Sequence, residues 1–208
     1  KIIFKPVAKA YRSLPSPVRT GTSNALVNIS SLITIPNNVL QGEFKTAGIN
    51  TGRFIVNTTV GILGIFDVAK KMGFSEYVKE DYGQTLGVWG VGPGCYVVLP
   101  VLGPSTLRDT AGSFMNVMGG DPYYNVSTHG NNQYLDRSDY MLTKTLTAID
   151  FRAKTLDSFE NLEKNSMDFY ASVKSLYLQD RQRKIFNTRA DATIEILYEG
   201  DWEELETQ

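Results

Sequence analysis

Three long stretches without a charged residue constrain this chain more than any other feature of its sequence. They comprise 23 residues from Thr20 to Gly42, 13 residues from Phe54 to Phe66 and 26 residues from Tyr82 to Leu107. About one residue in five is charged (21%), so a surface wholly covered by water would interrupt such stretches. A membrane-spanning helix needs about 20 predominantly apolar residues. The first stretch is instead rich in Ser, Thr and Asn, and the third in Gly and Pro, so neither is typical of a spanning helix.

Two environments are compatible with these stretches. Irregular, glycine-rich backbone cannot face hydrocarbon, because its amides and carbonyls would lack hydrogen-bond partners. The stretches therefore either lie at a membrane interface around a polar cavity or form the buried core of an ordinary water-soluble protein. Sequence patterns alone leave both alternatives open.

Hydrophobic spacing predicts a single all-α domain. Ser23 and Ser166 are the predicted N-caps of two of its helices, and Gly42 is a predicted helix end. Residues 119–135 are expected to be turn-rich. The predicted helices span residues 4–11, 23–41, 44 to 61 or 64, 67–72, 105–118, 136–156 and 166–185.

Residues 90–103 (GVGPGCYVVLPVLG) differ from the rest of the chain. Glycines at both ends flank Tyr96–Leu99, whose side chains favour extended structure. We therefore expect an extended loop or a hairpin among the helices.

Charge is distributed unevenly, although the net charge is only −1. Residues 191–208 hold seven acidic and no basic residues, which leaves 21 basic and 15 acidic residues in the rest of the chain. The net charge argues against a general nucleic-acid binder. An acidic tail, taken as residues 188–208, would either dock on a basic partner or only aid solubility.

Motifs for chemistry are missing. The sequence contains no G-x-S-x-G nucleophile elbow and no phosphate-binding G-x-x-x-x-G-K-[ST] loop. A single histidine, His129, makes a histidine-rich metal site implausible, and a single cysteine, Cys95, excludes an intramolecular disulfide. We expect no catalytic residues, no cofactor and no metal.

Five ordered segments together resemble the MlaA (VacJ) family of Gram-negative outer-membrane lipoproteins. They are YRSLPSPVRTGTSNALVNI (11–29), NNVLQG (37–42), RFIVNTTVGILGIFDVA (53–69), EDYGQTLGVWGVGPG (80–94) and YVVLPVLGPSTLRD (96–109). A weaker match continues in residues 149–158 and 168–181, so the resemblance covers residues 1–187. The family's signal peptide and lipidated cysteine are not in this chain, and Cys95 stands where the family usually has proline.

The resemblance implies a ring-like helical domain over residues 1–187, lying in the periplasmic-facing leaflet of the outer membrane. Its central channel would passively remove mislocalised phospholipid from the outer leaflet. The implied partners are phospholipid, a periplasmic lipid carrier similar to MlaC, and a trimeric porin. Two alternatives stay open: a phospholipid hydrolase and a porin-bound structural scaffold.

Candidate site residues follow from these motifs. Gly90, Gly92, Gly94, Tyr96, Pro100 and Gly103 are expected to shape either a mobile loop that gates the lipid path or a rigid turn. The polar motif residues are Arg53, Asn57, Asp67, Gln84, Arg108 and Asp109, with roles in headgroup contact, helix capping or structural ion pairs. Phe54, Phe66 and Trp89 fit a membrane interface, with core packing as the equal alternative.

Overall fold

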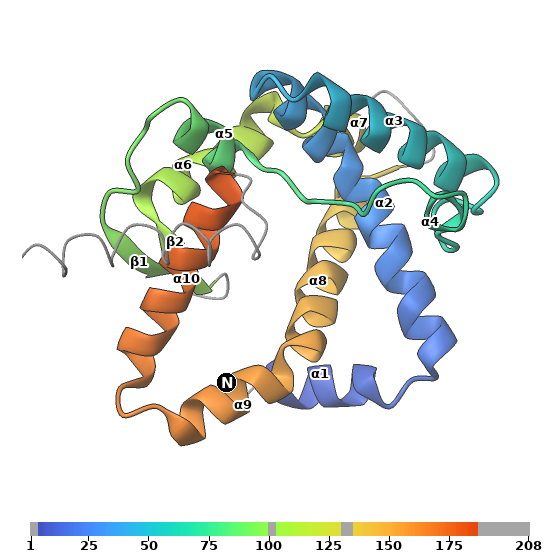
Figure 1. Cartoon of the computed structure of the whole chain (residues 1–208). Helices are drawn as coiled ribbons and strands as arrows, with labels where there is room; N and C mark the ends of the chain where they lie inside the picture. Colours follow the sequence, from blue (N-terminus) through green and yellow to red (C-terminus); the bar gives the residue numbers. More distant parts are fainter. Residues whose placement is uncertain (1–3, 100–102, 130–134, 187–208) are drawn as a thin grey trace, which may run out of the picture.

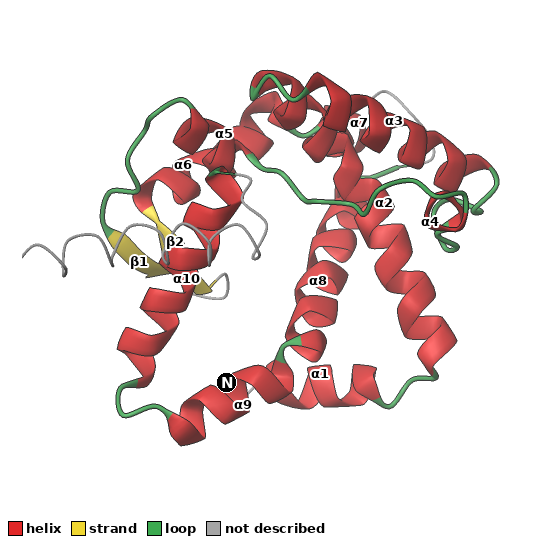
Figure 2. Cartoon of the chain, in the orientation of Figure 1, coloured by secondary structure: helices red, strands yellow, loops and turns green. Residues whose placement is uncertain are grey.

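The computed structural model describes residues 4–99, 103–129 and 135–186. The predicted acidic tail, 188–208, lies outside the described residues. Within the described part, Figure 2 shows helices almost throughout and one small sheet, which confirms the all-α prediction. The elements are α1 (Phe4–Arg12), α2 (Ser16–Leu40), α3 (Phe44–Thr59), α4 (Val68–Lys71), α5 (Tyr82–Val88), β1 (Tyr96–Leu99), β2 (Gly103–Thr106), α6 (Leu107–Met115), the π-helical turn η1 (Asn116–Gly120), α7 (Pro122–His129), α8 (Arg137–Lys154), α9 (Leu156–Asn165) and α10 (Phe169–Ile185).

The helices are arranged as a ring. In Figure 1, α8, α9 and α10 form three sides, and α5, α6 and α7 close the fourth. Helix α2 packs against α3, and α1 packs against α8, which braces the ring from outside. The hairpin lies beside α10, with β2 in contact with that helix. Chain segments far apart in the sequence thus face one central space.

Strands β1 and β2 confirm the predicted hairpin. They pair antiparallel, with Tyr96 opposite Thr106 and Leu99 opposite Gly103. Thr106 then caps α6, because its side chain accepts a hydrogen bond from the Asp109 amide. The hairpin therefore leads directly into a helix that faces the centre of the ring.

The structure corrects the predicted start of the second helix. Helix α2 begins at Ser16, and Ser23 lies inside it rather than at its N-cap. A proline in the first turn favours this earlier start, because its missing N–H would have no partner there and its φ is already helical. Ser23 instead accepts a hydrogen bond from the Lys154 ammonium of α8.

The predicted helix 136–156 is confirmed as α8, which Asp136 caps and which ends at Lys154. Two other predictions of local structure were wrong. The stretch 119–135 contains a helix, α7, whose first amides at Tyr123 and Tyr124 donate to the Asp121 carboxylate. Asp168 rather than Ser166 caps α10, because a carboxylate there accepts the Ala171 amide hydrogen bond. In addition, α5 and α9 lie in stretches where no helix was predicted.

Polar side chains dominate the buried positions. Among the described residues, 20 buried side chains are polar or charged and only eight are hydrophobic, of which four are alanine. In α2, for example, Thr34, Asn37 and Asn38 are fully buried while Val39 and Leu40 are exposed. A water-soluble protein normally buries the opposite set. This distribution favours the membrane-interface alternative over an ordinary soluble core.

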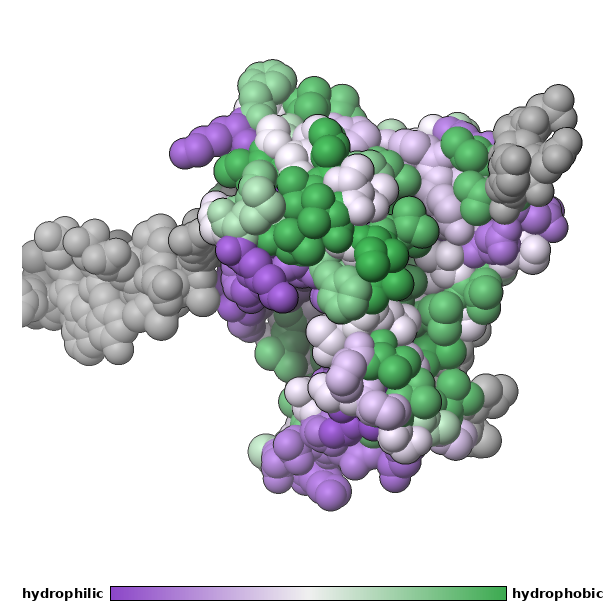
Figure 3. All heavy atoms as spheres, turned by 90° about the vertical axis from the view of Figure 1, so that its right-hand side faces the viewer, coloured by the Kyte–Doolittle hydropathy of each residue, from purple (hydrophilic) through white to green (hydrophobic). Residues whose placement is uncertain are grey.

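Hydrophobic side chains gather on the outside of the molecule. Figure 3 shows them across the side that carries α2, α3 and α4. Val60, Ile62, Leu63 and Phe66, just after α3, are each more than half exposed. Ile62 and Leu63 also adopt φ angles of 52° and 56°, which are unusual for non-glycine residues and costly for a branched side chain. The backbone therefore presents a strained, apolar loop to the exterior.

Candidate functional site

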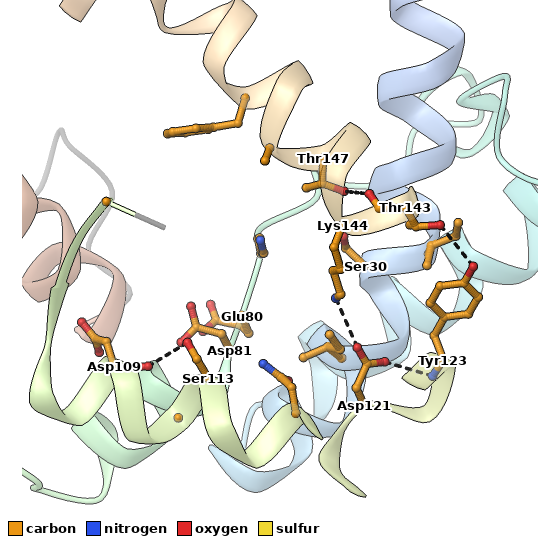
Figure 4. Close-up of a pocket in the computed structure, with 18 of the residues that line it drawn as sticks. Ser30, Glu80, Asp81, Asp109, Ser113, Asp121, Tyr123, Thr143, Lys144 and Thr147 are labelled. Atoms are coloured by element: carbon orange, nitrogen blue, oxygen red, sulfur yellow. Dashed lines mark hydrogen bonds and ion pairs between the residues drawn. The ribbon is translucent and has the colours of Figure 1, made fainter. Parts of the chain in front are cut away.

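The ring encloses a cavity of about 850 Å³. This volume lies within the range of sites that hold sizeable small molecules, roughly 300–1,000 Å³. Its wall contains residues from α2, α6, α7, α8, α9 and α10 and from the segment that precedes α5. Figure 4 shows polar side chains on two opposite sides of this space.

The wall formed by α7 and α8 carries an ion pair. The Lys144 ammonium lies 3.2 Å from Asp121 Oδ2, and it also lies 4.9 Å from the centre of the Tyr140 ring. Burial, followed by the charge of Asp121, raises the pKa of the Tyr140 hydroxyl. Tyr123 and Thr143 share a hydroxyl–hydroxyl hydrogen bond of 3.1 Å beside this pair. This wall therefore presents hydrogen-bonded hydroxyl groups beside an ion pair whose two charges balance each other.

The opposite wall carries a buried network centred on Arg181 of α10. Its guanidinium donates to both carboxylate oxygens of Asp81, at 2.8 and 2.9 Å, and to Asp109 Oδ1 at 2.8 Å. Burial opposes ionisation of Asp81, but the hydrogen bonds and charge of Arg181 outweigh it and lower its pKa to about 2. Tyr177 donates a hydrogen bond of 2.6 Å to Asp109 Oδ2. The network joins α5, α6 and α10 into one unit.

Glycines allow the helices of this network to approach closely. A Cβ atom added to Gly112 of α6 would lie 2.3 Å from the Gly83 nitrogen of α5. A Cβ atom on Gly83 would lie 2.6 Å from Asp109 Oδ1 and 2.8 Å from Arg181 Nη2. Real Cβ atoms do not approach other atoms so closely. Both glycines are therefore required for the contact that brings Asp81 and Asp109 to the same guanidinium.

Glu80 differs from the neighbouring acid Asp81. Its side chain is 1% exposed, and it accepts a hydrogen bond of 3.0 Å from Gln41. Burial raises the pKa of Glu80 to about 7, although the hydrogen bond from Gln41 partly opposes the shift. Glu80 therefore keeps its proton to a higher pH than an exposed glutamate does.

Apolar side chains and two further cations complete the lining. Ile29 and Ile33 come from α2, Phe151 from α8 and Phe159 from α9. The remaining cations are Lys79 and Arg152. The cavity is thus amphipathic, because charged, hydroxyl and hydrocarbon side chains all line it.

The predicted polar motif residues divide into two clusters. Arg53 donates two hydrogen bonds to the Asp67 carboxylate, at 2.8 and 2.9 Å, and Asn57 donates a third at 3.0 Å. Asn57 also accepts the Ala69 amide hydrogen bond. These three motif residues join α3 to the N-terminus of α4, outside the cavity lining.

The second cluster belongs to the cavity wall. Arg108 donates to Asp109 Oδ1 from both Nε and Nη2 at 3.1 Å, and its third bond goes to the Val91 carbonyl. Gln84 is buried and donates to Asp81 and to the Lys79 carbonyl. Of these motif residues only Asp109 lines the cavity directly, while Gln84 and Arg108 support residues that do.

The predicted gating loop is only partly at the cavity. Gly90, Gly92 and Gly94 lie between α5 and β1, Gly103 lines the cavity, and Pro100 lies outside the described residues. Positive φ angles of 88°, 66° and 85° occur at Gly90, Gly94 and Gly103, where other residues would be strained. Tyr96 contacts the rings of Tyr170 and Tyr177 edge-on, with centroids 5.7 and 6.0 Å apart.

The predicted interface aromatics differ in exposure. Phe54 is half-buried, whereas Phe66 is 53% and Trp89 is 56% exposed. The Trp89 indole donates a hydrogen bond of 3.1 Å to the Leu40 carbonyl, so its polar end is satisfied while its ring faces outward. Every helix of the described ranges is too short or too polar to span a bilayer. The same part of the chain holds no cluster of three or more metal-ligand side chains.

Most residues that line the cavity were missed at the sequence level. Lys79, Asp121, Lys144, Arg152 and Arg181 were not singled out. A signal was present in α8, where polar or aromatic residues recur at helical spacing at positions 140, 143, 144, 147 and 151. No local pattern could reveal Arg181, because its partners are 72 and 100 residues away.

A solved structure has the same helical architecture. It was reported under the heading "Structural basis for maintenance of bacterial outer membrane lipid asymmetry". The two chains are 32% identical, each is covered to 88%, and the TM-score is 0.74. The chain therefore has the fold of a class of helical proteins that is known from work on the lipid asymmetry of the bacterial outer membrane.

Sequence comparison gives the family. The model of the MlaA lipoprotein family matches residues 1–184, so the chain belongs to the MlaA lipoprotein family. It is 36% identical over 182 residues to the Escherichia coli (strain K12) protein named "Intermembrane phospholipid transport system lipoprotein MlaA", covering 85% of this chain and 67% of that protein. An uncharacterized protein of Rickettsia bellii is 33% identical over 186 residues, covering 88% and 69%. The identically named Haemophilus influenzae protein is 27% identical over 190 residues, covering 89% and 71%.

Proposed function

We propose that this chain moves phospholipid through the central cavity, from the outer membrane towards the periplasm, and so maintains the lipid asymmetry of that membrane. The observation that carries this proposal is an amphipathic cavity of about 850 Å³ inside a ring that exposes many hydrophobic side chains on its outside. The names of its Escherichia coli and Haemophilus influenzae relatives, which describe phospholipid transport between membranes, support the same function.

The two kinds of cavity wall match the two ends of a phospholipid. Hydroxyl and charged groups on α7 and α8, such as those of Tyr123 and Lys144 (Figure 4), can replace water around the headgroup. Ile29, Ile33 and Phe151 can cover the acyl chains. Neither end would then be transferred into an unfavourable medium. Transfer needs no covalent step, so we propose a carrier path rather than an enzyme.

The apolar exterior suits a protein immersed at the membrane. We propose that the loop 60–66, which ends in Phe66, contacts lipid in the periplasmic-facing leaflet of the outer membrane. Phe54 and Trp89 would contact the same lipid. A trimeric porin would cover part of the same surface. A periplasmic carrier similar to MlaC would receive the lipid, and its higher affinity would set the direction of net transfer.

The glycine-rich segment would control access to the cavity. Gly90, Gly92 and Gly94 would allow the loop before β1 to change conformation, and strands β1, which begins at Tyr96, and β2, which begins at Gly103, follow it. Arg53, Asn57 and Asp67 would hold the frame, and Gln84, Arg108 and Asp109 would hold the wall that this loop faces. In this proposal, only Asp109 and Gly103 of these residues meet lipid directly.

Obstructing the cavity tests the proposal. Ala148 and Thr145 are both exposed on α8, but only Ala148 lines the cavity. Liposomes that carry the protein and a fluorescent phosphatidylethanolamine would be mixed with a soluble lipid carrier, and transfer would be followed over time. We expect Ala148→Trp to slow transfer at least tenfold, because the indole fills space that the lipid must cross. Thr145→Trp is the matched control and should transfer at the unmodified rate.

The same experiment separates the alternatives. Lipid recovered after transfer should be intact, whereas a hydrolase would release lysophospholipid and fatty acid. A structural scaffold would give no transfer with either variant or with the unmodified chain. Equal transfer by Ala148→Trp and Thr145→Trp would contradict a path through the cavity.

A further inference from the structure

The chain itself joins the sides of the ring at every corner except one. Helices α6, α7, α8, α9 and α10 follow one another along the sequence, so peptide bonds connect each of these sides to the next. At the remaining corner, α10 returns to α5 and β2, which precede α6, and only non-covalent contacts of the described residues hold it there. The ring can therefore part at this corner without a break in the chain.

The contact at this corner, which we call the seam, depends on Arg181. It is the only residue of α10 that is buried, and its guanidinium reaches Asp81, the N-cap of α5, and Asp109 on α6, at 2.8 Å each. Tyr177, one turn earlier on α10, adds a hydrogen bond of 2.6 Å to Asp109. The seam is therefore fastened by charge-assisted hydrogen bonds, and α10 contributes no fully buried apolar side chain.

Lipid cannot replace the bonds of such a polar seam. Apolar contacts between helices gain little inside a bilayer, because acyl chains cover the separated surfaces as well as the partner helix does. An acyl chain offers no partner to a guanidinium or a carboxylate, so separating Arg181 from Asp81 and Asp109 beside hydrocarbon would leave charges unpaired. The seam thus resists opening in the surroundings that the proposed function gives to this protein.

We propose that the Arg181 seam keeps the ring closed to the phospholipids that surround it, so that the cavity takes lipid from the opposite leaflet only. A ring in the periplasmic-facing leaflet has the lipids of that leaflet around its rim, whereas the lipid to be removed comes from the other leaflet. A gap at the seam would admit the surrounding lipids and abolish this choice. The inference rests on the proposed transport function, because it assigns the choice of lipid source to Arg181, Tyr177 and their two carboxylate partners.

Transfer from each leaflet of asymmetric vesicles tests this inference. The full chain is added from outside to preformed vesicles, so that it occupies their outer leaflet. Fluorescent phosphatidylethanolamine is placed either in that leaflet or only in the inner one, and a soluble lipid carrier outside the vesicles is the acceptor. After subtraction of the rates without protein, we expect the unmodified chain to transfer inner-leaflet lipid at least tenfold faster than outer-leaflet lipid.

Opening the seam should abolish this preference. Arg181→Met should reduce it to less than twofold by raising the transfer of outer-leaflet lipid. Lys184→Met, which removes an exposed cation further along α10, is the matched control and should keep the preference. Circular dichroism establishes that each variant is folded. Tyr177→Phe removes only the bond to Asp109, should give an intermediate preference, and decides the test if Arg181→Met does not fold.

A covalent seam separates closure of the ring from other effects of Arg181. A Cβ atom at Gly87 would lie 2.8 Å from Ile185 Cγ1, which is one bond from the Ile185 Cβ atom, so cysteines at these two positions are close enough for a disulfide between α5 and α10. Gly87→Cys/Ile185→Cys would be combined with Arg181→Met and Cys95→Ser. This chain should regain the tenfold preference when it is oxidised and lose it again in dithiothreitol.

Each contrary result has a separate meaning. Equal transfer from both leaflets by the unmodified chain would overturn the inference while the proposed function stands. A preference that Arg181→Met and Tyr177→Phe leave unchanged, or that oxidation of the double-cysteine chain does not restore, would overturn it as well. If the unmodified chain transfers lipid from neither leaflet, the proposed function fails and the inference with it.

Discussion

Replacing Arg181 should destabilise the protein more than any surface change on the same helix. Arg181→Met removes the only guanidinium that reaches both Asp81 and Asp109 in the described residues, and it leaves both carboxylates in a largely buried setting. Breaking a buried ion pair from one side costs roughly 3–5 kcal/mol. The Asp81 side chain is 32% exposed in the folded protein, and Arg108 still forms an ion pair with Asp109. We therefore expect the lower end, about 3 kcal/mol at pH 7.

The loss should shrink as the pH falls. In the unmodified protein the pKa of Asp81 is about 2, below its usual 3.8, so its contribution to stability is present above pH 3.8 and disappears towards pH 2. Without Arg181, burial would raise the pKa of both carboxylates above the usual value. Their protonation below about pH 4 then relieves the penalty in the variant.

Chemical denaturation in mild detergent, followed by circular dichroism at pH 7 and pH 3.5, measures both effects. Lys184→Met is the matched control, because Lys184 forms an exposed ion pair with Asp180 one turn further along α10. Such surface pairs contribute about 0.5 kcal/mol or less. A cost for Arg181→Met below about 1 kcal/mol, or a cost that does not change with pH, would refute the proposed energetic role of the network.

Two further predictions concern the buried residues Glu80 and Gly112, each with an exposed position for comparison. The pKa of Glu80, about 7, lies above its usual 4.5, so its contribution to stability is complete below pH 4.5 and is lost as the pH rises through 7, by up to about 3 kcal/mol. Glu80→Gln should remove this dependence between pH 5 and 9 in denaturation curves, whereas exposed Glu76→Gln should leave it intact. Gly112→Ala should cost roughly 1–3 kcal/mol because its Cβ atom would meet Gly83 at 2.3 Å. Gly48→Ala, in α3 with open space around it, should stabilise the protein by about 0.5–1 kcal/mol, and the opposite sign of either change would contradict the packing.

Local signals in the sequence were sufficient for much of the fold. Hydrophobic spacing predicted a helix from residue 44, which is α3, and a helix over 67–72, which contains α4. The flanking glycines predicted the hairpin correctly. Helix α9 was missed, because no glycine or proline at Thr155 marks it as a separate element from α8. Helix α7 was missed because an Asp–Pro pair is equally typical of a turn and of a helix start.

The site was less accessible to sequence reasoning. The lack of charge in residues 20–42 indicated an unusual environment, and the polar burial of Thr34 and Asn37 agrees with that interpretation. The cavity itself depends on contacts across the ring, such as the one between Arg181 and Asp81. The spacing of residues along the chain does not reveal such long-range contacts. Only the three-dimensional arrangement therefore identifies which charged side chains line the cavity.

Photolabelling locates the lipid most directly. A phosphatidylethanolamine that carries a diazirine near the end of one acyl chain would be incorporated into membranes with the protein, activated by light, and mapped to residues by mass spectrometry. The account predicts labelled peptides that contain Ile29, Ile33, Phe151 or Phe159, and loss of this labelling in Ala148→Trp but not in Thr145→Trp. Labelling confined to the exposed loop 60–66, with none in the cavity, would contradict a lipid path through the ring.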